Sequence, residues 1–174
     1  MKILILFFAL NLCNYVYLYP NGAPLQQCDK MMPGHGATPL DDQPPYQIIY
    51  LPNNSSGGFD VSIISPDMTR FKGFLIQARG RWDGKAIGKW QTRVPNSKAI
   101  DCFGFSDSAV THNWHDDDLT KHYFQGVTFT WVPPYSRKLN RVKFVATIVQ
   151  SFKKIYYNVS SQMMLKSFKL TQLN

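Results

Sequence analysis

Alternation of apolar and polar residues with a period of two is the feature that most limits how this chain can fold. In the segment GVTFTWV, Val127, Phe129 and Trp131 share one face and the intervening threonines share the other. The segments YQIIYL, GFDVSII, GFLIQAR and VKFVATIVQ have a similar composition and period. A period of two places alternate side chains on opposite faces of a β-strand, whereas an amphipathic helix needs a period near 3.6 residues. We therefore predict an all-β protein.

The architecture predicted from these segments is an immunoglobulin-like antiparallel β-sandwich. β-Branched and aromatic residues dominate the segments, and Gly, Pro or Asn residues separate them, which favours short antiparallel strands. About seven to nine such segments suit two packed sheets, although periodicity alone leaves a closed barrel as the alternative. In GFLIQAR, Phe74, Ile76 and Ala78 are expected to point inward. Residues 83–100 and 112–124 are predicted to be long connections.

The first residues have the composition of a secretory signal peptide. Lys2 precedes the apolar run ILILFFALNL, which is too short to span a bilayer as a mature helix and shows no strand alternation. We assign residues 1–18 to the signal peptide, with cleavage between residues 13 and 18. The remaining residues, 19–174, are predicted to form a single domain that is secreted to the extracellular space and has no transmembrane anchor. We expect it to be a monomer.

Removal of the signal peptide takes Cys13 and leaves Cys28 and Cys102 in an oxidising compartment. We predict that these two cysteines form a disulfide; the alternative is two buried free thiols. Cys28 lies in the segment YPNGAPLQQCDKMMPGHG, which is rich in Pro and Gly and has no periodicity. The bond would staple this irregular N-terminal arm onto the body. Met31 and Met32 would either plug the end of the sandwich beside Cys28 or offer an adaptable apolar contact to a lipid or partner.

The blocks YPNGAP, CDKMMPGHG, FKGFLIQAR, DCFGFSDSAVTH, VTFTWVPP and VKFVATIVQSF resemble, in this order, those of reeler domains, over residues 19–157. The resemblance implies a β-sandwich, agrees with the cysteine pairing and supplies no catalytic residue. A stand-alone reeler domain behind a signal peptide resembles the small secreted defence proteins of invertebrates, which are linked to innate immunity and to binding of microbial surfaces. The charged segment NWHDDDLTKHYFQ departs from the family pattern.

No residue pattern in the chain points to catalysis or to a cofactor. The sequence has no GxSxG elbow, no HExxH and no Gly-rich phosphate loop, so we predict a non-enzymatic protein. His112, His115 and His122 flank an Asp triplet, and these side-chain types could hold a transition metal. However, an Asp triplet is typical of a solvated turn, and the first two histidines would point to opposite sides of a strand. We therefore predict no metal site.

Three N-glycosylation sequons occur, at Asn53 and Asn54 in NNSS and at Asn158 in NVS. The first two lie in a turn between two predicted strands, where an acceptor would be exposed. We predict one glycan on this turn, and Asn158 is the weaker candidate because its segment resembles a strand.

The net charge of +8 indicates attraction to polyanions. Cationic residues are dense from Arg70 to Lys98, and the loop after Gly80 is predicted to be exposed. The predicted ligand-binding residues are Arg79, Arg81, Trp82, Lys85 and Lys89. For an exported protein, the expected partners are microbial polyanions or glycolipids of the lipopolysaccharide type and not nucleic acid. The alternatives are an ordinary basic surface and, in another functional class, an extracellular-matrix or cell-adhesion module that binds a protein.

Overall fold

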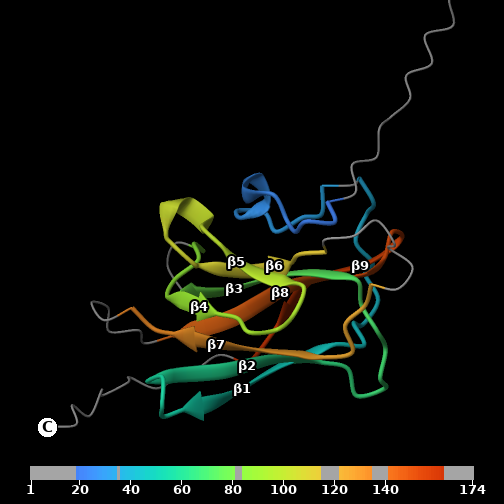
Figure 1. Ribbon diagram of the computed structural model, residues 1–174. Coiled ribbons are helices and arrows are strands. Elements are labelled where there is room, and N and C mark those ends of the chain that lie inside the picture. The colour runs from blue at the N-terminus through green and yellow to red at the C-terminus, as the bar shows by residue number, and fades with distance from the viewer. Residues whose placement is uncertain (1–18, 35, 81–83, 115–121, 135–140, 163–174) are drawn as a thin grey trace, which may run out of the picture.

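The computed structural model describes residues 19–34, 36–80, 84–114, 122–134 and 141–162. Nine strands in this part of the chain form two antiparallel sheets that face each other (Figure 1). The predicted all-β sandwich is therefore confirmed. The described helices are two short 3-10 turns, η1 at Leu25–Gln27 and η2 at Cys102–Gly104. Neither is long enough to cross a membrane.

One sheet has four strands in the order β1-β2-β7-β4 and the other has five in the order β5-β6-β3-β8-β9. The strands of the first are β1 (Gln47–Asn53), β2 (Gly58–Ile64), β7 (Val127–Val132) and β4 (Lys89–Gln91). Those of the second are β5 (Ser97–Ile100), β6 (Ala109–His112), β3 (Gly73–Gly80), β8 (Val142–Ser151) and β9 (Lys154–Ser160). All described strand pairs are antiparallel.

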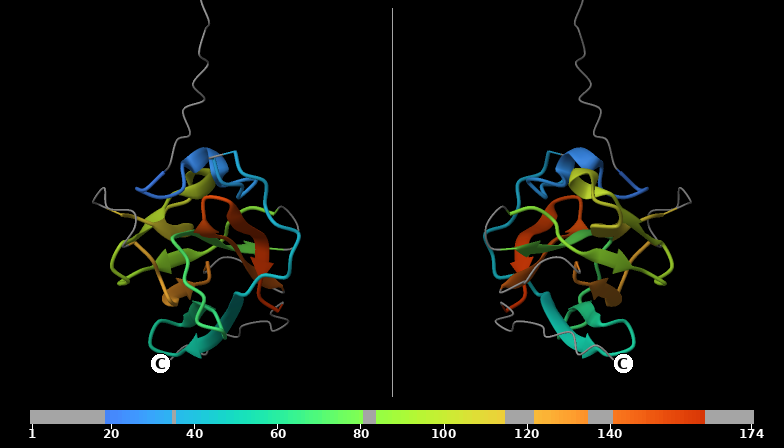
Figure 2. Two further views of the ribbon diagram at one scale, coloured as in Figure 1. Left: turned by 90° about the vertical axis from the view of Figure 1, so that its right-hand side faces the viewer. Right: turned by 90° about the vertical axis from the view of Figure 1, so that its left-hand side faces the viewer.

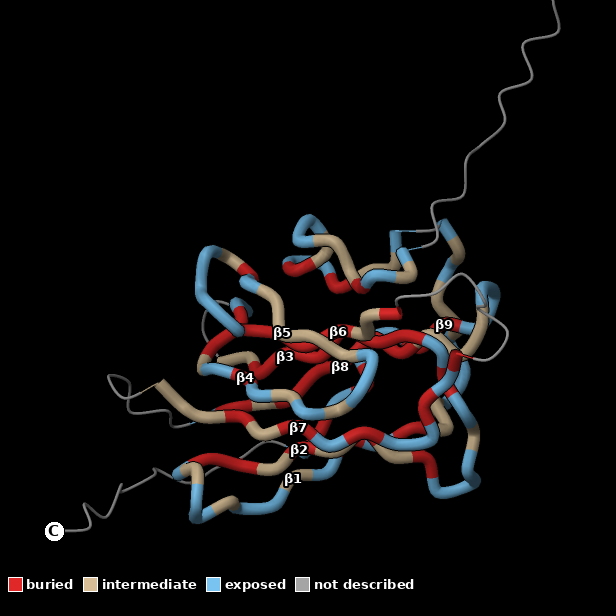
Figure 3. The backbone as a smooth tube through the Cα atoms, in the orientation of Figure 1, coloured by how far each residue is buried: buried red, intermediate tan, exposed pale blue. Residues whose placement is uncertain are grey.

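The core lies between the sheets, where alternate residues of facing strands are buried (Figure 3). Phe74, Ile76 and Ala78 of β3 point into it with at most 2% exposure, as their alternation predicted. Trp131 of β7 occupies the opposite sheet and packs edge-on against Phe144, with ring centroids 5.3 Å apart. The period of two in the sequence thus corresponds to the face of each sheet that meets the core, because successive strand residues point to opposite faces.

Residues 83–100 are not one long connection, so that prediction is wrong. They contain β4 and β5, each of which is one of the two edge strands of its sheet. Only Trp90 is buried in β4, and none of the four β5 residues is fully buried. Such short edge strands have too few inward-facing residues to produce a visible alternation.

The N-terminal arm, residues 19–34, lies on the outer face of the five-stranded sheet (Figures 1 and 2). The predicted disulfide is present and joins Cys28 of the arm to Cys102 at the start of η2. The arm covers this face, and Leu75, Ala109 and Val145 are buried beneath it.

Met31 anchors the arm beside Cys28, where its side chain is 2% exposed. The predicted anchoring of the arm is confirmed, but the Met31 side chain does not lie at the end of the sandwich. Met31 packs on the outer face of the five-stranded sheet, because Leu75, Ala109 and Val145 on that face are apolar and need a cover. Met32, by contrast, is only half-buried and lines a cavity.

Candidate ligand-binding groove

A groove with a cavity volume of about 240 Å³ lies between the arm and the five-stranded sheet. The ends of β3, β6 and β8 line one side, and the arm lines the other with Tyr19, Pro20, Ala23, Pro24, Gln27, Met32, Pro33 and Gly34. An apolar cavity of ~150 Å³ is large enough to bind benzene, and pockets for drug-sized ligands begin near ~300 Å³. The groove therefore has room for a narrow apolar group.

His112, the last residue of β6, connects the arm to the floor of this groove. Its Nε2 donates to the carbonyl of Tyr19 at 3.0 Å, and its Nδ1 accepts from the backbone N–H of Phe74 at 3.2 Å. Burial lowers the pKa of His112 below 6.5, which favours the neutral ring with one donor and one acceptor that this pairing needs. Gly73 permits the contact, because a Cβ there would lie 3.0 Å from the imidazole.

Other polar groups around the groove are also bonded within the protein. The Thr147 hydroxyl donates to the carbonyl of Met31, and the Trp114 indole N–H donates to the carbonyl of Lys72 at 2.8 Å. The Thr111 hydroxyl donates to the carbonyl of Phe74 at 2.7 Å and accepts from the N–H of Ala23 at 2.9 Å. Because these groups are occupied, the groove presents mainly carbon to a ligand.

Trp114 and His122 form one wall of the groove, stacked with ring centroids 4.4 Å apart and an interplanar angle of 7°. Of the three histidines considered as metal ligands, His112 uses both ring nitrogens in backbone hydrogen bonds, and His115 lies outside the described residues. Among the residues that the structure describes, no three His, Cys, Asp or Glu side chains form a group suited to a metal ion.

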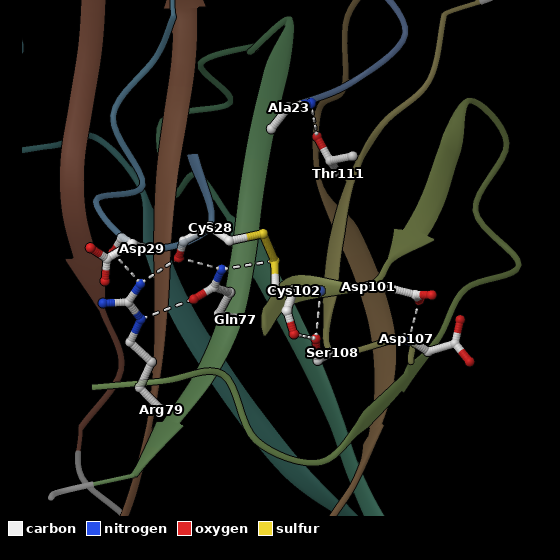
Figure 4. Close-up of a disulfide and its surroundings, with 10 residues drawn as sticks. All are labelled: Ala23, Cys28, Asp29, Gln77, Arg79, Asp101, Cys102, Asp107, Ser108 and Thr111. Atoms are coloured by element: carbon white, nitrogen blue, oxygen red, sulfur yellow. Dashed lines mark hydrogen bonds between the residues drawn. A yellow bond between two sulfur atoms is a disulfide. The ribbon is translucent and has the colours of Figure 1, made fainter. Parts of the chain in front are cut away.

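Arg79, predicted as a ligand-binding residue, is bonded to the arm (Figure 4). Its Nη2 donates to the carbonyls of Cys28 at 2.9 Å and Asp29 at 2.7 Å, and its Nε donates to Gln77 Oε1 at 2.9 Å. Gln77, fully buried, donates to the same Cys28 carbonyl at 3.0 Å. Partial burial lowers the pKa of Arg79 below its usual value, but the guanidinium stays charged at any physiological pH. Arg79 therefore has a structural role that the sequence did not predict.

The other predicted ligand-binding residues are only partly brought together. Lys85 is exposed and precedes Ala86, which forms a β-bridge with Arg79. Lys89 is exposed on β4, at the edge of the other sheet. Arg81 and Trp82 lie outside the described residues, so the group as a whole stays a prediction.

The groove itself was missed at the sequence level, although one signal was available. The segment FVATIV in β8 is apolar at nearly every position, and Val145 faces the arm while Phe144 and Ala146 face the core. A nearly continuous apolar run is typical of a strand covered on both faces. It could have indicated that a second layer, the arm, covers this sheet.

Comparison with known proteins identifies the family. The family model for the Reeler domain matches residues 26–171. The chain belongs to the reeler domain family. Defense protein l(2)34Fc of Drosophila melanogaster is 36% identical over 141 residues, which cover 78% of this reeler domain chain and 81% of that protein. A protein of Antheraea mylitta named "Putative defense protein 3" is 33% identical over 146 residues, covering 82% and 83% of the two chains.

A solved structure supports the reeler fold independently. The crystal structure of the human F-spondin reeler domain (fragment 1) matches with a TM-score of 0.56 and 16% identity, covering 75% of this chain and 94% of that chain. At this identity the likeness concerns the fold alone. The family resemblance in the sequence blocks and the two-sheet architecture therefore agree.

Proposed function

We propose that this reeler domain is a secreted innate-immune protein that binds microbial or other anionic surfaces without catalysis. The observation that carries the proposal is the similarity, over most of both chains, to insect proteins named defence proteins. The net charge of +8 supports a preference for anionic partners. Lipopolysaccharide-like glycolipids and other surface polyanions present the matching charge outside cells.

The exposed cations suit many weak contacts better than one strong contact. Lys85 and Lys89 lie beyond one end of β3, whereas Arg70 and Lys72 precede its other end, and Lys153 lies between β8 and β9. An exposed ion pair contributes at most about 1 kcal/mol and weakens with salt. Binding to a surface would therefore need several of these side chains at once.

Replacing Arg81, Lys85 and Lys89 together by Ser is expected to lower binding to whole bacteria at least tenfold near physiological salt. Arg79 is kept because it holds the arm. The measurement is a pull-down with bacteria, fungi and host matrix over a salt series, with circular dichroism to verify folding.

A net-charge-matched control replaces Arg70, Lys153 and Lys154 by Ser, near the opposite end of β3. A smaller loss in this control would place the binding surface at the Lys85 end. Binding that is indifferent to salt between about 0.05 and 0.5 M, where screening acts, contradicts the electrostatic mechanism. Capture by host matrix alone would then favour the adhesion-module alternative.

We further expect the glycan of the β1–β2 turn to be on Asn54. The Asn53 Nδ2 donates to Asp60 Oδ1 at 2.9 Å and its Oδ1 accepts from the N–H of Ser56 at 3.1 Å, whereas Asn54 is exposed. A glycan on Asn53 would compete with a hydrogen bond of the same nitrogen. In protein from eukaryotic cells, Asn54→Gln should abolish the mass shift on deglycosylation.

Ser55→Ala is the matched control, because it removes only the Asn53 sequon. It should leave the mass shift unchanged. Loss of the shift in Ser55→Ala but not in Asn54→Gln would assign the glycan to Asn53. A shift that survives the double change of Asn53 and Asn54 to Gln would assign it to Asn158.

A further inference from the structure

We propose that the groove beneath the arm binds the hydrocarbon chain of a single-chain anionic amphiphile, a long-chain carboxylate, with its head group beside Lys72. This inference concerns dissolved amphiphile monomers. It does not rest on the proposed binding of microbial surfaces, and it fails or holds independently of it.

The shape of the groove suits one chain and no larger ligand. The two limbs of the arm meet where Gly34 packs against the Tyr19 ring, since a Cβ on Gly34 would lie 2.6 Å from that ring. Leu75 and Val149 of the five-stranded sheet lie on the opposite side. The volume of about 240 Å³ between them accommodates part of one alkyl chain.

The chemistry of the lining favours hydrocarbon over water. The polar side chains of His112, Thr147 and Trp114 already bond to backbone atoms. A water needs two to four polar partners to stay in a cavity, and apolar cavities without them stay dry and bind apolar molecules. An alkyl chain would bury its surface here without leaving these groups unpaired.

The charge at the rim favours an anionic head group. Among the described residues that line the groove, Lys72 is the cation and none is acidic. Lys153 follows Phe152, which lines the groove and is 41% exposed. Lys98 reaches the arm, with its Cε 3.2 Å from the position that a Cβ on Gly22 would take. The charged side chains that the structure describes at these three positions are therefore cations, which favours a carboxylate over a neutral head group.

Isothermal titration calorimetry of the secreted protein tests the inference with octanoate, decanoate and dodecanoate, each below its critical micelle concentration. Affinity should rise about fourfold per added methylene, equivalent to ~0.8 kcal/mol, until the groove is full. Binding should show a negative heat-capacity change. Acetate should not bind, and dodecanol should bind more weakly than dodecanoate. An affinity that does not depend on chain length would overturn the proposal.

Filling the groove should abolish this binding. Val149→Phe and, separately, Ala23→Leu place extra carbons in the cavity, and each folded variant should bind dodecanoate at least tenfold more weakly. Ile49→Phe, on the exposed face of β1, is the matched control and should bind normally. Lys72→Gln should weaken dodecanoate binding severalfold and leave dodecanol binding unchanged, whereas Arg93→Gln, at an exposed position outside the groove, should change neither.

Three outcomes contradict the inference. In the first, both folded groove-filling variants bind dodecanoate as tightly as the parent does; in the second, Lys72→Gln lowers the affinity for dodecanol as much as the affinity for dodecanoate. In the third, the parent binds no carboxylate and forms a dimer that Val149→Phe dissociates. The last would assign the groove to contact between two copies. If both filling variants fail to fold, the chain-length series and Lys72→Gln decide. Whole-bacteria binding by the filled variants separates this inference from the proposed function, since bacteria should still be bound.

Discussion

Replacing Cys28 and Cys102 together by alanine is expected to lower the free energy of unfolding by about 2–5 kcal/mol, the usual range for a native disulfide of a small secreted domain. The bond spans 74 residues. On the loop-closure model, a loop of this length contributes roughly 4 kcal/mol through the unfolded state. Urea unfolding of the secreted double variant measures the loss.

The effect should be concentrated in the arm. Besides the disulfide, residues 19–34 are held on the sheet by the buried Met31 side chain and by hydrogen bonds, among them those from His112 and Arg79, and these contacts depend on the arm staying in place. Amide hydrogen exchange should therefore accelerate most in the arm, and dodecanoate binding should be lost with the groove. Cys13→Ala is the control. Because Cys13 is predicted to leave with the signal peptide, the secreted protein should have the same free energy of unfolding as the parent. Equal midpoints for the double variant and the parent would argue against a stapled arm.

Arg79→Met is expected to lower the free energy of unfolding by about 1–3 kcal/mol. The variant removes charge-assisted hydrogen bonds to the carbonyls of Cys28 and Asp29, each of a class that contributes about 1.5–3 kcal/mol when buried. Because the guanidinium is partly exposed, each bond contributes less than a fully buried one. The two bonds together are therefore expected to contribute no more than one bond of that range. Urea unfolding at neutral pH gives the value.

Two controls separate the structural role of Arg79 from a ligand contact. Arg79→Lys keeps the charge but loses the paired geometry, so it should recover only part of the stability. Arg93→Met removes an exposed charge and should change stability by no more than about 0.5 kcal/mol. If Arg79→Met keeps full stability but loses binding to bacteria, Arg79 contacts the ligand and the structural interpretation is wrong.

The strands that the sequence predicts well are those with one face in the core. Val127, Phe129 and Trp131 alternate with threonines, and all three are buried in β7. The edge strands β4 and β5 could not be predicted in this way, because their pairing depends on neighbours distant in sequence. Trp90, for example, lies opposite Trp131 in the register of β4 and β7.

The structural role of Arg79 also could not be predicted from the local sequence. In the sequence it is one of several cations near a predicted loop, and nothing local distinguishes it from Lys85 or Lys89. In the structure its guanidinium meets carbonyls about 50 residues away in the chain. A hydrogen bond between such distant residues depends on the packing of the arm, which no local pattern encodes.

By itself, the sequence determined the all-β class, the inward face of the long strands and the pairing of Cys28 with Cys102, because strand periodicity and cysteine number are local or countable properties. Only the tertiary structure decided that the arm covers the outer face of the five-stranded sheet and leaves a groove beneath it. The physical reason is that an irregular segment has no periodicity to indicate its contacts. Its position follows from which apolar surface of the folded sheets remains to be covered.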